Sequence, residues 1–156
     1  MASLRSGVDS WRRFWRLSPQ EKSWFLQAAV WLPLTGLGIR WMGLRRWMSF
    51  LEHLPAPAIS THDALPPDAT ARMVAAAARR IPFSSNCLQR SVVLWWLFRC
   101  RGFAAKLWFG SRKEGDLLEA HAWVDLDGRR FDVSEAAPTD FMPFDRPVAS
   151  GQGKPQ

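Results

Sequence analysis

The sequence predicts an α+β fold, in which a buried helix packs against a small antiparallel sheet and an N-terminal helical extension precedes both. Residues 87–100 are apolar on nearly every face, which is typical of a buried helix. After Gly102 the hydrophobic period changes to two, which is typical of strands. Asp127-Gly128 adds a strong signal for a two-residue hairpin. With 156 residues, the chain is long enough for one domain with its own core.

A helix is expected to begin at Pro19. The motif Ser18-Pro19-Gln20-Glu21 has the pattern of a capping box with proline at the first helical position. Pro33 and the Gly36/Gly38 pair are expected to end this helix, which would cover residues 19–32. A second helix is then predicted over residues 39–53.

The apolar stretch 24–39 is too short and too interrupted to cross a bilayer, because a spanning helix needs about 20 apolar residues. Two interpretations remain for these helices. In the first, they pack on the rest of the domain. In the second, they form an interfacial hairpin with Trp31, Trp41 and Trp47 as anchors, which predicts peripheral contact with a membrane.

The domain organisation follows from composition. A basic, Trp-rich helical region over 1–54 precedes a Pro-rich linker over 55–67, and a core over 68–149 precedes a flexible tail over 150–156.

The helices of the core have their own end signals. Asp68 is placed to cap a helix over residues 69–80, and Ser84, Ser85 or Asn86 to cap the central helix. Gly102 is the expected left-handed terminator of that helix.

Three strands are expected after the central helix. They cover residues 104–110, 118–126 and 129–134, with a polar turn over 111–116 between the first two. Residues from about 135 are expected to be irregular.

Charge and cysteine usage bound the function classes. The net charge of +7 suits an acidic peptide, an anionic lipid surface or nucleic acid as a partner, and it is also consistent with a role in solubility alone.

Cys87 and Cys100 on one helix lie ~20 Å apart, too far for a disulfide, so both thiols are expected to be free and the protein cytoplasmic. The N-terminus lacks the pattern of a signal peptide. No Cys/His pair has metal-ligand spacing, which disfavours a metal site, and no cofactor is expected.

Cys87 is the candidate nucleophile. It is expected in the first turn of the central helix, where unpaired N–H groups and the helix dipole favour a thiolate over a thiol. Cys100, at the other end, is expected to be an inert apolar residue, and His53 and His62 are expected on the surface.

The hairpin register predicts which aspartate lies beside His121. With Asp127-Gly128 as the turn, Trp123 faces Asp132, so Asp132 is the diagonal neighbour of His121 and can orient its imidazole. Asp125 faces Arg130, where a salt bridge is expected. The core face of the hairpin should consist of Ala120, Ala122, Val124, Phe131 and Val133.

The predicted chemistry is thiol catalysis. Cys87 attacks a carbonyl, His121 acts as base and then as acid, and Asp132 orients His121. The oxyanion site is assigned to the backbone N–H of Cys87, helped by Asn86 or Gln89. Supporting roles around this site are assigned to Arg90, Ser91 and Trp123.

Two motifs carry a family resemblance. A cysteine on a helix followed by a histidine and an aspartate on successive strands is the order of papain and the transglutaminases. The motifs Cys87-Leu88-Gln89-Arg90-Ser91 and Ala120-His121-Ala122-Trp123-Val124 resemble the protease half of split lasso peptide B proteins, which are transglutaminase-like cysteine peptidases. The Ser18-Pro19-Gln20-Glu21-Lys22 start also resembles that family.

The resemblance implies removal of the leader from a ribosomally made precursor peptide. It also implies a small leader-recognition protein and an ATP-dependent macrolactam cyclase as partners. By matching motif, Cys87 and His121 carry over as nucleophile and base, whereas Asp132 rests on the hairpin register.

Two rival functions stay open at this stage. The same residues could serve a transglutaminase or amidase that acts on another amide. Alternatively, the basic Trp-rich half could be a non-enzymatic binding module. Its aromatic residues fall in apolar helical runs rather than among stacking positions, which argues against nucleic acid as a partner.

Overall fold

The computed structural model describes residues 17–55, 66–82, 85–114, 117–133, 141–144 and 147–150. Their arrangement is the predicted α+β fold. The elements are α2 (Pro19–Met42), α3 (Leu44–His53), α4 (Pro67–Arg80), α5 (Cys87–Cys100), β1 (Lys106–Glu114), β2 (Leu117–Leu126), β3 (Arg129–Phe131), β4 (Met142–Pro143) and β5 (Ala149–Ser150).

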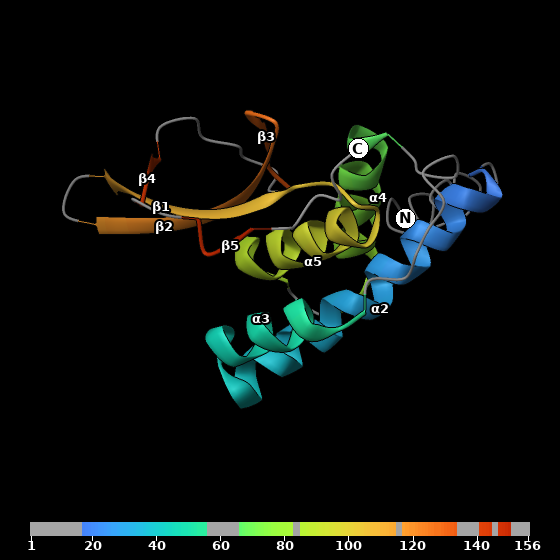
Figure 1. The fold of residues 1–156 in the computed structure, drawn as a ribbon, viewed down its shortest axis with the longest axis horizontal. Helices are drawn as coiled ribbons and strands as arrows, with labels where there is room; N and C mark the ends of the chain where they lie inside the picture. The colour runs from blue at the N-terminus through green and yellow to red at the C-terminus, as the bar shows by residue number, and fades with distance from the viewer. Residues whose placement is uncertain are drawn as a thin grey trace, which may run out of the picture.

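The elements form layers that all contact the central helix α5. The antiparallel sheet has the order β3-β2-β1-β4, and β5 pairs with β1. One face of this sheet lies on α5, and α2 with α3 forms the layer beyond α5, farthest from the sheet (Figure 1). Helix α4 packs against both α2 and α5.

Helix α5 is the centre of the hydrophobic core, as its apolar sequence predicts. All residues from Val92 to Phe98 are buried, and Trp95 and Phe98 are fully enclosed. Their neighbours in the same core come from both the helical layers and the sheet. These are Leu32, Leu51, Val74, Leu107 and Val124.

The predicted break at Pro33 is wrong, because α2 continues through Pro33 to Met42. The capping box at Ser18 and Glu21 is confirmed at its start. The two glycines serve helix packing instead of termination. A Cβ on Gly38 would overlap the ring of Trp47 on α3, and one on Gly36 would lie 3.1 Å from the side chain of Gln89 on α5. The chain turns at Gly43, whose φ of +78° favours glycine.

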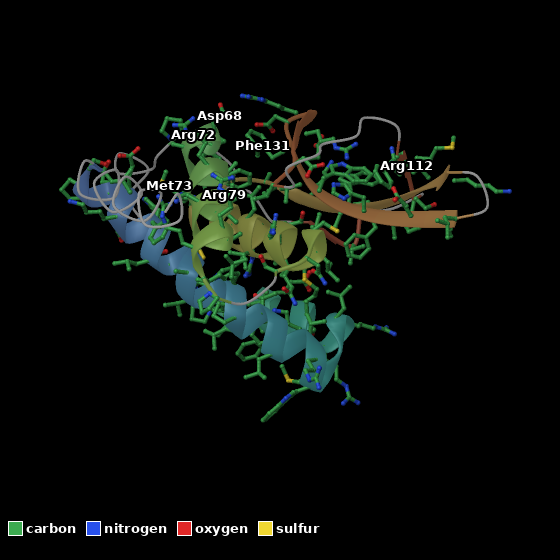
Figure 2. The ribbon with its side chains drawn as sticks, turned by 180° about the vertical axis from the view of Figure 1, so that it is seen from behind. Asp68, Arg72, Met73, Arg79, Arg112 and Phe131 are labelled. Carbon is green, nitrogen blue, oxygen red and sulfur yellow. The ribbon has the colours of Figure 1, made fainter. Side chains whose placement is uncertain are left out.

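The predicted cap at Asp68 is also wrong. Helix α4 begins at Pro67, which needs no N–H partner at that position, and Pro66 is its N-cap without a side-chain hydrogen bond. Asp68 lies in the first turn and instead forms a two-bond ion pair with Arg129 of β3. Figure 2 shows Asp68 at the end of α4, close to Phe131 of β3. The carboxylate therefore links α4 to the sheet.

The ends of α5 agree with the prediction. Of the three candidate caps, Asn86 is the N-cap: its side chain accepts a hydrogen bond from the N–H of Gln89, and the Gln89 side chain accepts one from the N–H of Asn86. At the other end, Gly102 has a φ of +78°, as expected for a left-handed terminator. Cys87 is thereby held as the first residue of the helix.

The predicted hairpin register is confirmed. Asp127 and Gly128 both have positive φ, and the pairs Val124–Phe131, Asp125–Arg130 and Leu126–Arg129 face one another. The hairpin's third strand is shorter than predicted and ends at Phe131.

Other strand limits differ from the prediction. Strand β1 starts two residues later than expected and continues into the predicted turn as far as Glu114, which pairs with Leu117 of β2. Residues after 135 are not all irregular, since β4 and β5 extend the sheet along β1. Residues 151–156 of the predicted tail and Ser134 lie outside the described residues.

The N-terminal helices share the core with the sheet, so packing on the domain accounts for most of their aromatic residues. Trp47 is buried, and Trp31 packs its ring 5.4 Å from that of Trp96 on α5. Trp41 alone of the three predicted anchors is largely exposed, at 78%. Within the described residues, no helix combines the length and apolar character needed to cross a bilayer. The proposed domain boundaries remain predictions, and residues 56–65 of the linker are outside the described part.

Candidate active site

Cys87 stands where a helix presents its free N–H groups. It is half-buried, its thiol is free, and it follows directly on the Asn86 cap. Ser91 lies one turn further along the same face of α5, where its hydroxyl donates a 2.8 Å hydrogen bond to the backbone carbonyl of Ala122. This buried bond fixes the Cys87 face of α5 to β2 at the residue next to His121.

His121 and Asp132 form a buried pair. The Nε2 of His121 lies 2.6 Å from an Oδ of Asp132, and both side chains are less than a tenth exposed. Because an ionised carboxylate only accepts hydrogen bonds, this contact places a proton on Nε2 and leaves Nδ1 as the basic nitrogen of the neutral ring. The diagonal relation expected from the hairpin register is therefore present.

Arg130 does not form the salt bridge predicted with Asp125. Its guanidinium instead lies 3.2 Å from the Asp132 carboxylate and 4.1 Å above the ring of Trp123. The Asp125 carboxylate accepts a hydrogen bond from the N–H of Gly128 inside the turn. The positive charge of Arg130 therefore favours the ionised form of the carboxylate that holds His121.

Aromatic rings fix the imidazole from the sides. The ring of Phe141 lies 5.0 Å from that of His121, and Trp123 stacks at 6.4 Å. Gly110 on β1 allows this packing, because a Cβ there would lie 2.5 Å from the carbonyl of Met142 and 2.7 Å from the Trp123 ring. Trp123 thus packs beside the histidine, and its supporting role in the site stays a prediction.

An apolar pocket joins the cysteine to the histidine. It has a volume of about 190 Å³ and is lined by Cys87, Leu88, Phe109, Ala120, His121, Ala122 and Phe144. No hydrogen bond between Cys87 and His121 is present in the described part of the chain. Cysteine–histidine contacts that are loose in a free enzyme commonly tighten when substrate binds.

The site also corrects one prediction and includes residues that the sequence analysis did not identify. Ala120 is exposed on the pocket wall and does not belong to the core. Phe141 and Phe144 lie in a region expected to be irregular. Their signal was the apolar run Phe141-Met142-Pro143-Phe144, part of which pairs with β1 as β4.

The other residues expected to support the site form hydrogen bonds within and around α5. The side-chain oxygens of Asn86 and Gln89 each accept a hydrogen bond from the backbone N–H of the other residue and so cap the helix. Arg90 donates from Nε to the hydroxyl of Ser85, and Ser91 joins α5 to β2. The assignment of the backbone N–H of Cys87 as oxyanion donor stays a prediction.

The remaining cysteine and the first histidine lie away from this site. Cys100 is 5% exposed at the far end of α5, and burial raises the pKa of its thiol to about 11. His53 is exposed, and its Nδ1 lies 2.7 Å from the carbonyl of Ser49. His62 lies outside the described residues. Among those described, no group of three His, Cys, Asp or Glu side chains is placed to hold a metal ion.

Comparison with known proteins places these observations in a family. No curated protein and no solved structure matches the chain. The model of the transglutaminase-like superfamily matches residues 31–144, from the middle of α2 to the end of the pocket wall at Phe144. This match spans well over half of the 156 residues and includes Cys87, His121 and Asp132. The chain therefore belongs to the transglutaminase-like superfamily, which includes both cysteine peptidases and transglutaminases.

Proposed function

We propose that this protein is a cysteine peptidase that removes the leader from a ribosomally synthesised lasso peptide precursor. The observation that carries the proposal is the shared pocket of Cys87, at the start of a capped helix, and His121, held by Asp132. Superfamily membership supports cysteine-based chemistry. The finer assignment to leader removal rests on the resemblance of the Cys87–Ser91 and Ala120–Val124 motifs.

The residues divide the reaction between them. His121 Nδ1 takes the thiol proton of Cys87, and the sulfur attacks the scissile carbonyl to form a tetrahedral intermediate, whose oxyanion accepts a hydrogen bond from the Cys87 N–H. The C–N bond then breaks as His121 protonates the leaving amine. Water, deprotonated by His121, attacks the resulting thioester and releases the leader as a carboxylic acid. Asp132 holds the imidazole in the required tautomer throughout.

The pocket favours an apolar substrate residue beside the bond that is cut. Leu88, Phe109 and Phe144 offer hydrocarbon surface, and the small side chains of Ala120 and Ala122 leave room between them. Burial of an apolar side chain there would contribute binding free energy in proportion to its area.

The proposal includes partners and a compartment. A small leader-recognition protein would deliver the precursor, and an ATP-dependent macrolactam cyclase would use the new amino terminus. We expect the reaction in the cytoplasm, where both free thiols stay reduced.

The test is a cleavage assay with a candidate leader-core precursor and its recognition protein, read by mass spectrometry. Cys87→Ala should abolish release of the leader, whereas Cys100→Ala should retain most of it, because Cys100 is buried far from the pocket. Equal loss in both variants would remove the mechanism.

The mass of the product separates the proposal from its rivals. A product in which an added amine is joined to the acyl group, with little hydrolysis, would establish a transglutaminase instead. An intact precursor, with its recognition protein present, would leave the non-enzymatic binding module as the leading alternative. That alternative predicts salt-dependent binding that survives Cys87→Ala.

A further inference from the structure

One side of α2 is exposed although it is apolar along most of the helix. Between Lys22 and Arg40 the sequence contains no charged residue. The inner side of α2 is buried against the core, as expected for the residues Trp24, Phe25, Ala28, Leu32 and Gly38. The outer side carries an apolar stripe that the fold leaves uncovered. Its members and exposed fractions are Leu26 55%, Val30 57%, Leu34 44%, Leu37 48% and Trp41 78%.

The stripe runs along one helix face. Its members follow one another by three or four positions, which places them on one side of an α-helix over ~22 Å. A helix that is apolar all round is normally covered on every side. Met42 at 41% and Phe50 at 46% add exposed apolar surface near the turn into α3. Helix α2 lies in the layer farthest from the sheet (Figure 1), and none of the residues that line the pocket belongs to α2.

The charge at one end of the stripe is positive. Arg40 lies just before its last member, Arg45 and Arg46 follow it, and all three are exposed. In residues 17–55 the only acids are Glu21 and Glu52. Glu21 is used in the helix cap at the opposite end. An apolar face ending in an arginine cluster is complementary to an anionic surface with hydrocarbon beneath it.

We infer that this stripe docks the protein on an anionic lipid bilayer, with α2 lying in the plane of the interface. Acyl chains need no hydrogen-bonding groups, and none of the exposed members of the stripe has one except the indole of Trp41 at its end, where such rings meet headgroups. A second copy of the chain is the alternative occupant, and the measurement of oligomeric state below distinguishes it from a bilayer. The inference goes beyond the proposed peptidase activity and does not depend on it.

The test is flotation of the full chain with lipid vesicles. Vesicles of phosphatidylcholine with phosphatidylglycerol should bind the protein, and binding should weaken at high salt, whereas vesicles of phosphatidylcholine alone should bind much less. Leu34→Gln with Leu37→Gln should reduce the bound fraction at least tenfold. The matched control is Leu117→Gln with Leu118→Gln, two residues exposed to 74% on the sheet, which should bind like the original chain.

The charge component has its own pair of variants. Arg45→Gln with Arg46→Gln should weaken binding to anionic vesicles by roughly tenfold or more, since each arginine near such a surface contributes about 1 kcal/mol. Arg72→Gln with Arg79→Gln, which alters exposed arginines of α4 (Figure 2), should have little effect.

Three results would overturn the inference. One is an absence of binding to anionic vesicles. Another is binding that both the Leu34/Leu37 variant and the Arg45/Arg46 variant retain, which would assign it to basic residues elsewhere in the chain. The third is a dimer, measured by light scattering, that the Leu34/Leu37 variant converts to monomer, because the stripe would then be an interface between copies. Circular dichroism melting of each variant distinguishes lost binding from lost folding.

Discussion

At the residue scale, the function proposed here depends on which of two aspartates holds His121. Asp125 and Asp132 are both placed on the histidine's side of the hairpin by the alternation of the strands. Asp132 contacts the imidazole, and Asp125 serves the turn. Arg130 reinforces this division, because it pairs with the Asp132 carboxylate, whereas the Asp125 carboxylate accepts a hydrogen bond from the Gly128 N–H.

This division predicts unequal effects of two conservative variants. Asp132→Asn should lower kcat for precursor cleavage by roughly a hundredfold or more, because an amide no longer enforces the Nε2–H tautomer. Asp125→Asn should keep kcat within a few fold of the original. Rates across pH, with melting temperatures for both variants, separate a lost catalytic role from lost folding, and the reverse order of rates would contradict the assignment.

The two cysteines differ in the same way. Iodoacetamide near neutral pH should modify Cys87, which is half-buried at a helix start, and leave Cys100 intact, since burial both shields that thiol and raises its pKa to about 11. Peptide mass spectrometry on native protein measures the ratio. The same reaction in guanidinium chloride is the control, where both sites should react, and equal labelling of the native protein would be inconsistent with the structure.

At the element scale, α2 continues past the point where local propensity predicts that it ends. Proline and glycine are helix breakers by local propensity, which is why the sequence predicts an end near Pro33. The helix continues because its apolar inner side is buried against α4 and α5, and such packing outweighs local preferences. Gly38 in particular permits the close approach of Trp47.

The glycine contact can be tested by adding one methyl group. Gly38→Ala should lower the free energy of unfolding by about 1–3 kcal/mol, because its Cβ would overlap the Trp47 ring and α3 would have to move away. Gly36→Ala is the matched control in the same helix, where the neighbour is the end of a Gln89 side chain, and it should cost less. Urea denaturation measures both, and a more stable Gly38→Ala protein would show that α2 and α3 do not pack in this way.

At the scale of the whole molecule, helices and sheet share one hydrophobic core. Leu32 and Leu51 from the N-terminal helices belong to the same cluster as Trp95 of α5 and Val124 of β2. The layer that carries the apolar stripe is therefore built onto the layers that form the pocket, and folding of one should depend on the other.

A pair of leucines two residues apart tests this coupling. Leu32→Ala, at 1% exposure, should lower the free energy of unfolding by about 2–5 kcal/mol and reduce cleavage activity in parallel at elevated temperature. Leu34→Ala, at 44% exposure, should cost much less. Unfolding followed by tryptophan fluorescence and by labelling of Cys100 should give coincident transitions. Loss of the helical layer in a separate, earlier transition would contradict a shared core.

The sequence by itself determined the features that depend on local chemistry and strict periodicity. The capping residues around Cys87, the positive-φ hairpin at Asp127-Gly128 and the two-residue alternation were enough to place His121 beside Asp132. What only the tertiary structure decided depends on contacts between distant segments. Phe141 and Phe144 reach the site through pairing of β4 with β1. Arg130 pairs with Asp132 rather than with Asp125 because the folded hairpin brings its guanidinium close to the Asp132 carboxylate. The continuation of α2 past Pro33, and the exposure of its outer side, follow from which surfaces the other layers cover, and no local pattern encodes that coverage.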